Sequence, residues 1–160
     1  MRVALFLVIA LLLAMIQHAV IATWGWGPDL VLAWCVYLVG AGGLPRSVPY
    51  AWSAGLAHDI VDPGSWYFHT IVYLLLALAT RPLFGMLMFR PGLALGLLAA
   101  SWHILVQLID GSRSGWVGPG ITATLIDAVA TGLVAVALGW LAEGLPEKLR
   151  PTDRIVVQRH

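Results

Sequence analysis

Long uninterrupted runs of apolar residues dominate the chain, and short polar, glycine-containing or proline-containing segments separate them. Six such runs cover residues 3–22, 28–41, 47–61, 66–80, 91–110 and 121–141. A helix needs about 20 apolar residues to cross a bilayer, so the pattern predicts transmembrane helices. The runs are continuous rather than alternating, which is not the pattern of a transmembrane β-barrel. We therefore expect an all-α integral membrane protein with six transmembrane helices.

Composition supports this interpretation. The 160 residues are 60% hydrophobic and 11% charged, with a mean hydropathy of +0.88, whereas about a quarter of the residues of a soluble domain are charged. We predict one transmembrane domain over residues 1–145 and a polar cytoplasmic tail over residues 146–160. Residues 81–91 either extend the fourth helix or lie in the membrane interface. The single cysteine, Cys35, lies within an apolar run, so no internal disulfide is expected.

The basic residues predict an orientation. The first run is longer than the apolar core of a typical signal peptide and no A-x-A site closes it, so we expect it to be retained as a span. If the N-terminus is cytoplasmic, the inner segments hold every Lys and Arg except Arg113. Cytoplasmic segments are enriched in these residues. We therefore expect both termini on the cytoplasmic side.

Acidic residues and histidines gather on the predicted outer side, although charge close to lipid is costly. We define an outer polar cluster as Asp59, Asp62, His103, Asp110 and Asp127. His103, Gln107 and Asp110 recur at helical spacing, which predicts a polar stripe facing the bundle interior.

These groups can either lock helices together or bind a solute or a proton, and locking is favoured for Asp59 and Asp127. We expect Asp59 to accept hydrogen bonds from the turn at residues 64–65 or from a Trp or Tyr. Asp127 is expected to pair with a histidine, namely His18, His58 or His103.

Metal binding and catalysis have weaker support. His58, Asp59, Asp62, His69 and Asp127 are ligand types for a divalent ion, but no metal-binding spacing such as H-E-x-x-H or C-x-x-C occurs. No G-x-S-x-G motif is present either. We expect no catalytic residue, no metal and no cofactor, and the composition suggests no nucleic-acid partner.

Small residues recur at helical spacing on the last two runs. Gly92, Gly96 and Ala100 are spaced by four on one run, and Gly132 and Gly139 follow on the next. Small residues let transmembrane helices approach closely. We predict that these helix-packing grooves accept the single transmembrane helix of a partner.

The order of these features resembles the rod shape-determining protein MreD family. The second run begins with Pro28-Asp29-Leu30. The third ends in Gly55-x-x-x-Asp59, and a glycine-containing turn leads to a run with Tyr73. The turn Asp62-Pro63-Gly64 and the aromatic residues 66–68 depart from the commoner family pattern. The resemblance implies that the matching positions Pro28, Asp29, Gly55, Asp59 and Tyr73 shape the fold or a partner surface.

The resemblance also implies a fold and a function. The fold would be similar to the substrate-binding subunits of energy-coupling-factor transporters. The function would be that of a non-enzymatic scaffold in the bacterial inner membrane, which binds MreC and supports peptidoglycan synthesis and cell shape. MreB, the shape-determining glycosyltransferase and a class B transpeptidase would be indirect partners.

Two other functions stay open at this point. The first is a solute-binding membrane subunit of a vitamin transporter, with Asp59, Asp127 and His103 in its pocket. The second is a metal-dependent membrane enzyme that uses His58.

Overall fold

The structure, a computed structural model, describes residues 2–41, 44–62, 67–86, 91–114 and 120–144. Those residues form six helices and no strand, which confirms the predicted all-α class. The helices are α1 (Arg2–Trp24), α2 (Leu30–Ala41), α3 (Leu44–Val61), α4 (Phe68–Met86), α5 (Pro91–Ser114) and α6 (Ile121–Gly144).

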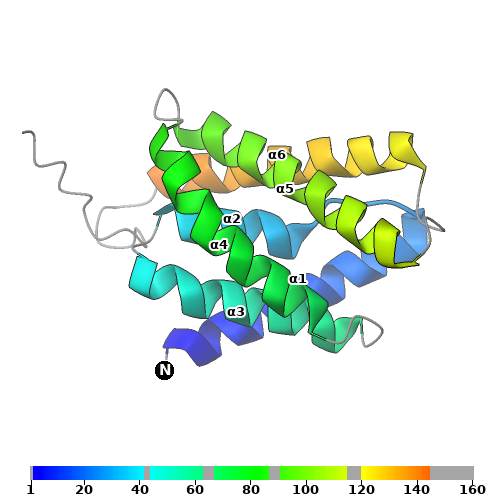
Figure 1. The fold of residues 1–160 in the computed structure, drawn as a ribbon, viewed down its shortest axis with the longest axis horizontal. Coiled ribbons are helices and arrows are strands. Elements are labelled where there is room, and N and C mark those ends of the chain that lie inside the picture. Colours follow the sequence, from blue (N-terminus) through cyan, green and yellow to red (C-terminus); the bar gives the residue numbers. More distant parts are fainter. Residues whose placement is uncertain (1, 42–43, 63–66, 87–90, 115–119, 145–160) are drawn as a thin grey trace, which may run out of the picture.

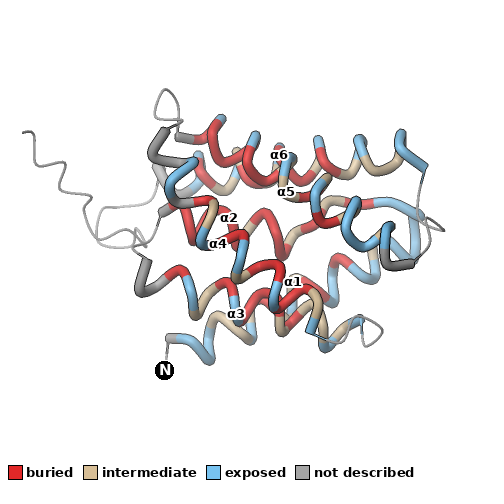
Figure 2. The backbone as a smooth tube through the Cα atoms, in the orientation of Figure 1, coloured by how far each residue is buried: buried red, intermediate tan, exposed pale blue. Residues whose placement is uncertain are grey.

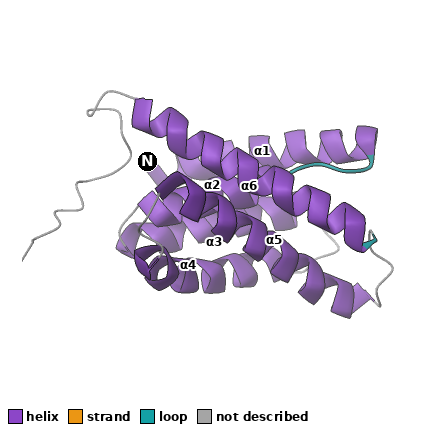
Figure 3. Ribbon diagram, turned by 90° about the horizontal axis from the view of Figure 1, so that it is seen from above, coloured by secondary structure: helices purple, strands orange, loops and turns teal. Residues whose placement is uncertain are grey.

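The helices pack as a bundle in which successive helices run in opposite directions (Figure 1). The pair α1 and α3 forms one side, the pair α5 and α6 forms the opposite side, and α2 and α4 lie between them. The start of α1 and the end of α6 consequently lie at the same end of the bundle. The view from above shows the same packing and the short non-helical segment that leads into α2 (Figure 3).

Helix α2 is the centre of the bundle and contacts α1, α3, α4, α5 and α6. All its residues from Val31 to Gly40 are buried except the half-buried Trp34 (Figure 2). A helix that is apolar on every side is expected to be buried in this way. With 12 residues, it is only about 18 Å long, which is shorter than the roughly 30 Å hydrocarbon core of a bilayer.

Three helices of the described chain are long and apolar enough to cross a membrane: Val3–Trp24, Gly92–Ser112 and Ile121–Leu141. Large apolar side chains cover the outside of these helices, and Leu12, Leu97 and Leu133 are 55%, 64% and 64% exposed. Exposed apolar surface of this extent marks contact with a membrane or a partner. The protein is therefore a helical protein with three helices capable of spanning a membrane.

Two helices contain an internal proline, and bounds of both differ from the predicted ones. Helix α3 begins at Leu44 and contains Pro49, and α4 continues through Pro82 to Met86. A proline in a helix interior removes one backbone hydrogen bond, and tertiary packing can tolerate this loss. Residues 81–86 thus extend the fourth helix, whereas residues 87–90 and the predicted tail lie outside the described residues.

The predicted glycine grooves face each other. A Cβ atom on Gly96 would lie 2.5 Å from Val136 Cγ2 and 3.0 Å from the carbonyl oxygen of Gly132, and one on Gly132 would lie 2.8 Å from the carbonyl oxygen of Gly96. Gly139 similarly approaches the Cα atom of Gly92. Helix α6 therefore fills the groove of α5, and the expectation that a partner's helix enters there is corrected.

Candidate functional site

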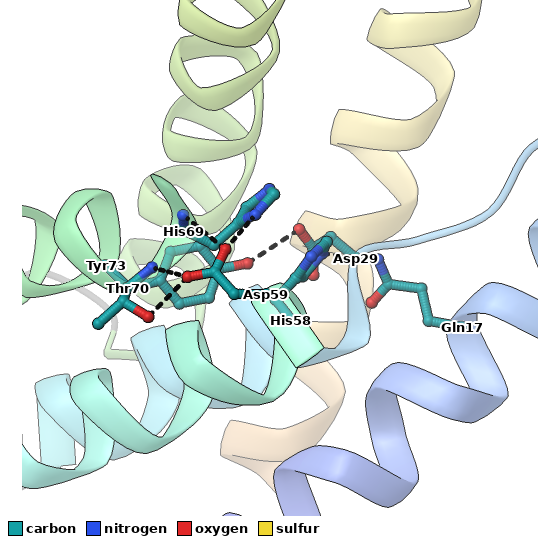
Figure 4. A network of polar contacts seen from close by, with 7 residues as sticks. All are labelled: Gln17, Asp29, His58, Asp59, His69, Thr70 and Tyr73. Atoms are coloured by element: carbon teal, nitrogen blue, oxygen red, sulfur yellow. Dashed lines mark hydrogen bonds and ion pairs between the residues drawn. The ribbon is translucent and has the colours of Figure 1, made fainter. Parts of the chain in front are cut away.

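The polar groups of the bundle concentrate at two places, the start of α2 and the start of α4, where side chains of one helix bind another. We call these two places joints, and Asp29 is the centre of the joint at α2. Asp29 is buried and directly precedes α2, where its carboxylate accepts a hydrogen bond from the backbone N–H of Leu32 at 2.8 Å. Its second oxygen accepts from the Tyr73 hydroxyl of α4 at 3.2 Å. Asp29 is thus the N-cap of α2 and joins α2 to α4 (Figure 4).

The segment before α2 is non-helical, and side chains of distant helices accept its backbone N–H groups. Gly27 donates to the Asp127 carboxylate at 3.1 Å, and Asp29 donates to the Thr131 hydroxyl at 2.8 Å, both on α6. Val31, in the first turn of α2, likewise donates its backbone N–H to the Gln17 side chain of α1 at 3.4 Å. Non-helical backbone away from water must be paired in this way.

Asp59 forms the second joint, between α3 and α4. One carboxylate oxygen accepts from the backbone N–H of His69 at 3.0 Å, and the other accepts from the backbone N–H and hydroxyl of Thr70 at 2.9 and 2.7 Å. Tyr67, which precedes α4, has a positive φ of 61° and an aromatic side chain that cannot act as an N-cap acceptor. Asp59 therefore caps α4 from the end of α3, and the positive N-terminus of α4 compensates its unfavourable place at a helix C-terminus.

Two imidazole rings continue from this joint toward α1. His69 Nδ1 lies 3.0 Å from the Asp59 carboxylate, and the His69 ring stacks on that of His58 with ring centroids 3.9 Å apart. His58 Nε2 lies 3.5 Å from the Gln17 side-chain nitrogen. Figure 4 shows these side chains in one continuous row from α4 to α1.

Gly55 allows the close approach of α3 and α4 on which this geometry depends. A Cβ atom at this position would overlap the Cα atom of Thr70 and would lie 2.6 Å from the carbonyl oxygen of His69. Only glycine fits against the backbone at such a distance. One turn further along α3, Asp59 reaches the same two residues of α4.

The positions taken from the family resemblance are therefore in contact. Gly55 and Asp59 hold the start of α4, and Tyr73 of α4 reaches Asp29 at the start of α2. Pro28 precedes the N-cap, because α2 begins at Leu30, two residues later than the predicted run. Because proline has no backbone N–H, no donor needs a partner between the paired groups of Gly27 and Asp29.

The outer polar cluster is not one site. Asp59 and Asp127 each bind backbone N–H groups, in two different joints, whereas the turn at residues 64–65 predicted for Asp59 lies outside the described residues. Asp62 and Asp110 are exposed. The predicted stripe is also wrong in part, because only His103 is buried, at 4% exposure, while Gln107 is half-buried and Asp110 faces outward.

His103 has no hydrogen bond to either joint. Neither of its ring nitrogens has a hydrogen-bond partner among the described residues, although most buried polar groups are paired. It is close enough to Asp29 and Asp127 to interact with them electrostatically.

A cleft of about 270 Å³ lies between α1 and the end of α3. Gln17, His18, His58 and Asp62 supply its polar groups, and Ala14, Ile21 and Val61 supply apolar walls. The predicted solute pocket of Asp59, Asp127 and His103 does not coincide with this cleft. Within the described ranges, no three His, Cys, Asp or Glu residues are placed to hold a metal ion.

Sequence reasoning missed Gln17, Thr70 and Thr131 as partners of the joints. All three lie within helices and are buried, and a polar residue inside an apolar run is a signal that it has a partner. That signal does not identify the partner, because Thr131 and Asp29 are 102 positions apart in the sequence.

No protein-family model, curated protein or solved structure matches this chain. The geometry defines the class of the protein as a helical bundle with three helices long and apolar enough to span a membrane, in which carboxylates cap the starts of α2 and α4.

Proposed function

We propose that this protein is a six-span, non-enzymatic scaffold of the bacterial inner membrane that serves the cell-elongation machinery, as its resemblance to the MreD family implies. Its direct partner would be MreC. MreB, the shape-determining glycosyltransferase and a class B transpeptidase would be reached through MreC. A fold similar to that of energy-coupling-factor substrate-binding subunits is part of the same proposal.

The observation that carries the proposal is the contact between the motif residues. Four of them, Asp29, Gly55, Asp59 and Tyr73, form the joints that hold α2, α3 and α4 together. Their carboxylates accept hydrogen bonds from backbone N–H groups of helix starts. This use of the acids favours a structural role over acid–base chemistry, and a rigid bundle suits a scaffold.

Six spans and two cytoplasmic termini are consistent with the bundle. An even number of antiparallel helices brings the start of α1 and the end of α6 to the same end. The short α2 does not need to span the bilayer alone, because the paired non-helical segment before it extends its path across the bundle. Non-helical backbone is tolerated at membrane depth where it is buried in protein.

The partner surface would be an outer helix face, because the α5–α6 seam is filled. The outer face of α6 exposes Val129, Leu133 and Trp140 at 61%, 64% and 70%. Without a strong hydrophobic drive between helices in lipid, packing of such side chains against a partner's helix would supply the affinity. Within the proposal, MreC would contact α6.

Affinity purification of the tagged chain from gently solubilised membranes, followed by mass spectrometry of proteins and small molecules, tests the proposal. We expect recovery of MreC and wall-synthesis enzymes. Leu133→Ala combined with Val129→Ala should reduce MreC recovery, and Leu12→Ala on the outer face of α1 is the matched control.

Absence of MreC from the purified material would contradict the scaffold role. Recovery of a cytoplasmic ATPase pair with a bound small molecule would point instead to a solute-binding transporter subunit. Equal loss of MreC in the α1 control would contradict the assignment of α6 as the contact face.

A further inference from the structure

The cleft between α1 and α3 has a chemistry that the scaffold role does not use. Its polar groups come from one face of each helix: Gln17 and His18 from α1, and His58 and Asp62 from the end of α3. His18 and Asp62 are exposed, and His58 is half-buried. The cleft therefore has an open polar rim and a deeper floor, where the His58 ring stacks on that of His69.

The size of the cleft limits its occupant. Its volume of about 270 Å³ corresponds to roughly nine water molecules at about 30 Å³ each. That is too much space for a single ion and slightly less than the roughly 300 to 1,000 Å³ of pockets for drug-sized ligands. A phospholipid headgroup, which is larger than a single ion and smaller than a drug-sized ligand, is of the right size.

The polar groups of the cleft are of two types. The imidazole rings of His18 and His58 and the amide of Gln17 carry N–H groups that can donate to an anionic oxygen. Asp62 lies just beyond the last residue of α3, where its carboxylate and the negative helix C-terminus both attract a cation. The arrangement is therefore suited to a zwitterion, with the anion near the histidines and the cation near Asp62.

The surroundings favour a lipid as the source of this zwitterion. Ile21 and Val61 form apolar walls of the cleft, and neighbouring residues of α1 expose apolar side chains, with Met15 and Ile16 61% and 53% exposed. Trp24, 66% exposed, lies at the end of the same helix. Tryptophan is enriched at the level of the lipid headgroups, so the cleft lies near that level in a bilayer.

We propose that this cleft binds the headgroup of a phospholipid with a primary ammonium, such as phosphatidylethanolamine. The phosphate contacts His18, His58 and Gln17, and the ammonium contacts Asp62. A quaternary ammonium, which cannot donate a hydrogen bond, fits less well, because the described residues that line the cleft include no aromatic cage of Trp, Tyr or Phe. The inference rests on one part of the proposed function, namely that the protein is embedded in a membrane. It does not depend on the binding of MreC.

Thermal unfolding of the purified, delipidated full chain in detergent tests the proposal. Phosphatidylethanolamine, phosphatidylcholine and phosphatidylglycerol are added separately at equal mole fractions, since a ligand of the folded state raises the unfolding temperature by mass action. We expect the largest shift with phosphatidylethanolamine, and an affinity for phosphatidylcholine that is about tenfold weaker, as expected for one charge-assisted hydrogen bond.

Variants on both sides of the contact sharpen the test. Asp62→Asn should remove the preference for phosphatidylethanolamine over phosphatidylcholine, and His18→Ala should weaken binding of both. Asp110→Asn, which changes another exposed acid outside the cleft, should leave the preference intact. Stepwise N-methylation of the lipid ammonium should lower the affinity stepwise, and this arm uses only the unaltered chain.

Three results would overturn the proposal. The first is equal stabilisation by phosphatidylethanolamine and phosphatidylcholine in the unaltered chain. The second is an undiminished preference in Asp62→Asn. The third is an equal shift with soluble glycerophosphoethanolamine, which would assign the cleft to a soluble headgroup rather than to a lipid. None of these results affects the recovery of MreC, so the two proposals fail separately.

Discussion

The polar joints at the starts of α2 and α4 and the glycine seam between α5 and α6 join helices in opposite ways. At the joints, Asp29 and Asp59 accept hydrogen bonds from backbone N–H groups that a helix start leaves without an intrahelical partner. At the seam, Gly96 and Gly132 approach backbone to backbone along helix middles, where these groups are already paired. Polar side chains are thus needed at helix ends, and small side chains are needed along helix middles.

Gly55 belongs to both kinds of contact, because it lets α3 touch the first turn of α4 beside Asp59. Loss of this contact separates the two helices and removes the cap in the same step. We therefore expect the loss in the free energy of unfolding to differ among substitutions at Gly55, at a joint, at the seam and at single polar side chains. Unfolding of the purified chain in detergent measures each loss.

The largest effect is expected for Gly55→Ala. The added Cβ atom would meet backbone atoms of His69 and Thr70, which cannot rotate away as a side chain can. We expect a loss of about 3 kcal/mol or more in the free energy of unfolding, at the upper end of overpacking effects. Gly120→Ala, where an added Cβ atom meets nothing within 4 Å, is the control. Equal stability of the two variants would contradict the close packing of α3 on α4.

Asp29→Ala should follow in magnitude. It leaves the backbone N–H of Leu32 and the Tyr73 hydroxyl without their acceptor in the bundle interior. The lost cap and an unpaired buried donor together should lower the free energy of unfolding by about 2 to 4 kcal/mol. Asp29→Asn keeps one acceptor oxygen and should recover part of this loss. Identical stability of the Ala and Asn variants would contradict the capping role.

Gly96→Ala should have a smaller effect, because one of its obstacles is a side chain. The Cβ atom would meet Val136 Cγ2 at 2.5 Å and the carbonyl oxygen of Gly132 at 3.0 Å, so α5 and α6 must move apart slightly. A loss of about 1 to 3 kcal/mol is expected. Gly92→Ala, whose nearest atoms belong to the Trp140 ring at 3.4 Å, should cost less, and the reverse order would contradict the seam.

The smallest effects are expected at single polar side chains. Tyr73→Phe removes one hydrogen bond to Asp29 and should lower the free energy of unfolding by about 1 kcal/mol. His103→Leu removes a buried side chain that has no hydrogen-bond partner among the described residues, so the free energy of unfolding should stay within about 0.5 kcal/mol or increase. A larger loss for His103→Leu than for Tyr73→Phe would show that His103 has a partner outside the described residues.

The sequence by itself determined the helical class of this protein and the positions of its helices. Apolar runs between turn residues predicted all six helices, because the periodicity and length of such runs depend only on neighbouring residues. The largest shift of a bound was at the end of α4, which continues through Pro82 because packing overrode the local signal. The motif residues Asp29, Gly55, Asp59 and Tyr73 were selected through the family resemblance rather than from the apolar pattern.

Only the tertiary structure decided what those residues contact. Asp127 accepts from Gly27, which is 100 positions away, and Asp59 caps the next helix at Thr70. Spacing along a helix places residues on one face, but it does not say which helix packs there. For this reason the small residues of α5 were predicted to face a partner, whereas they face α6. Long-range packing, which no local pattern encodes, assigns each polar group its partner.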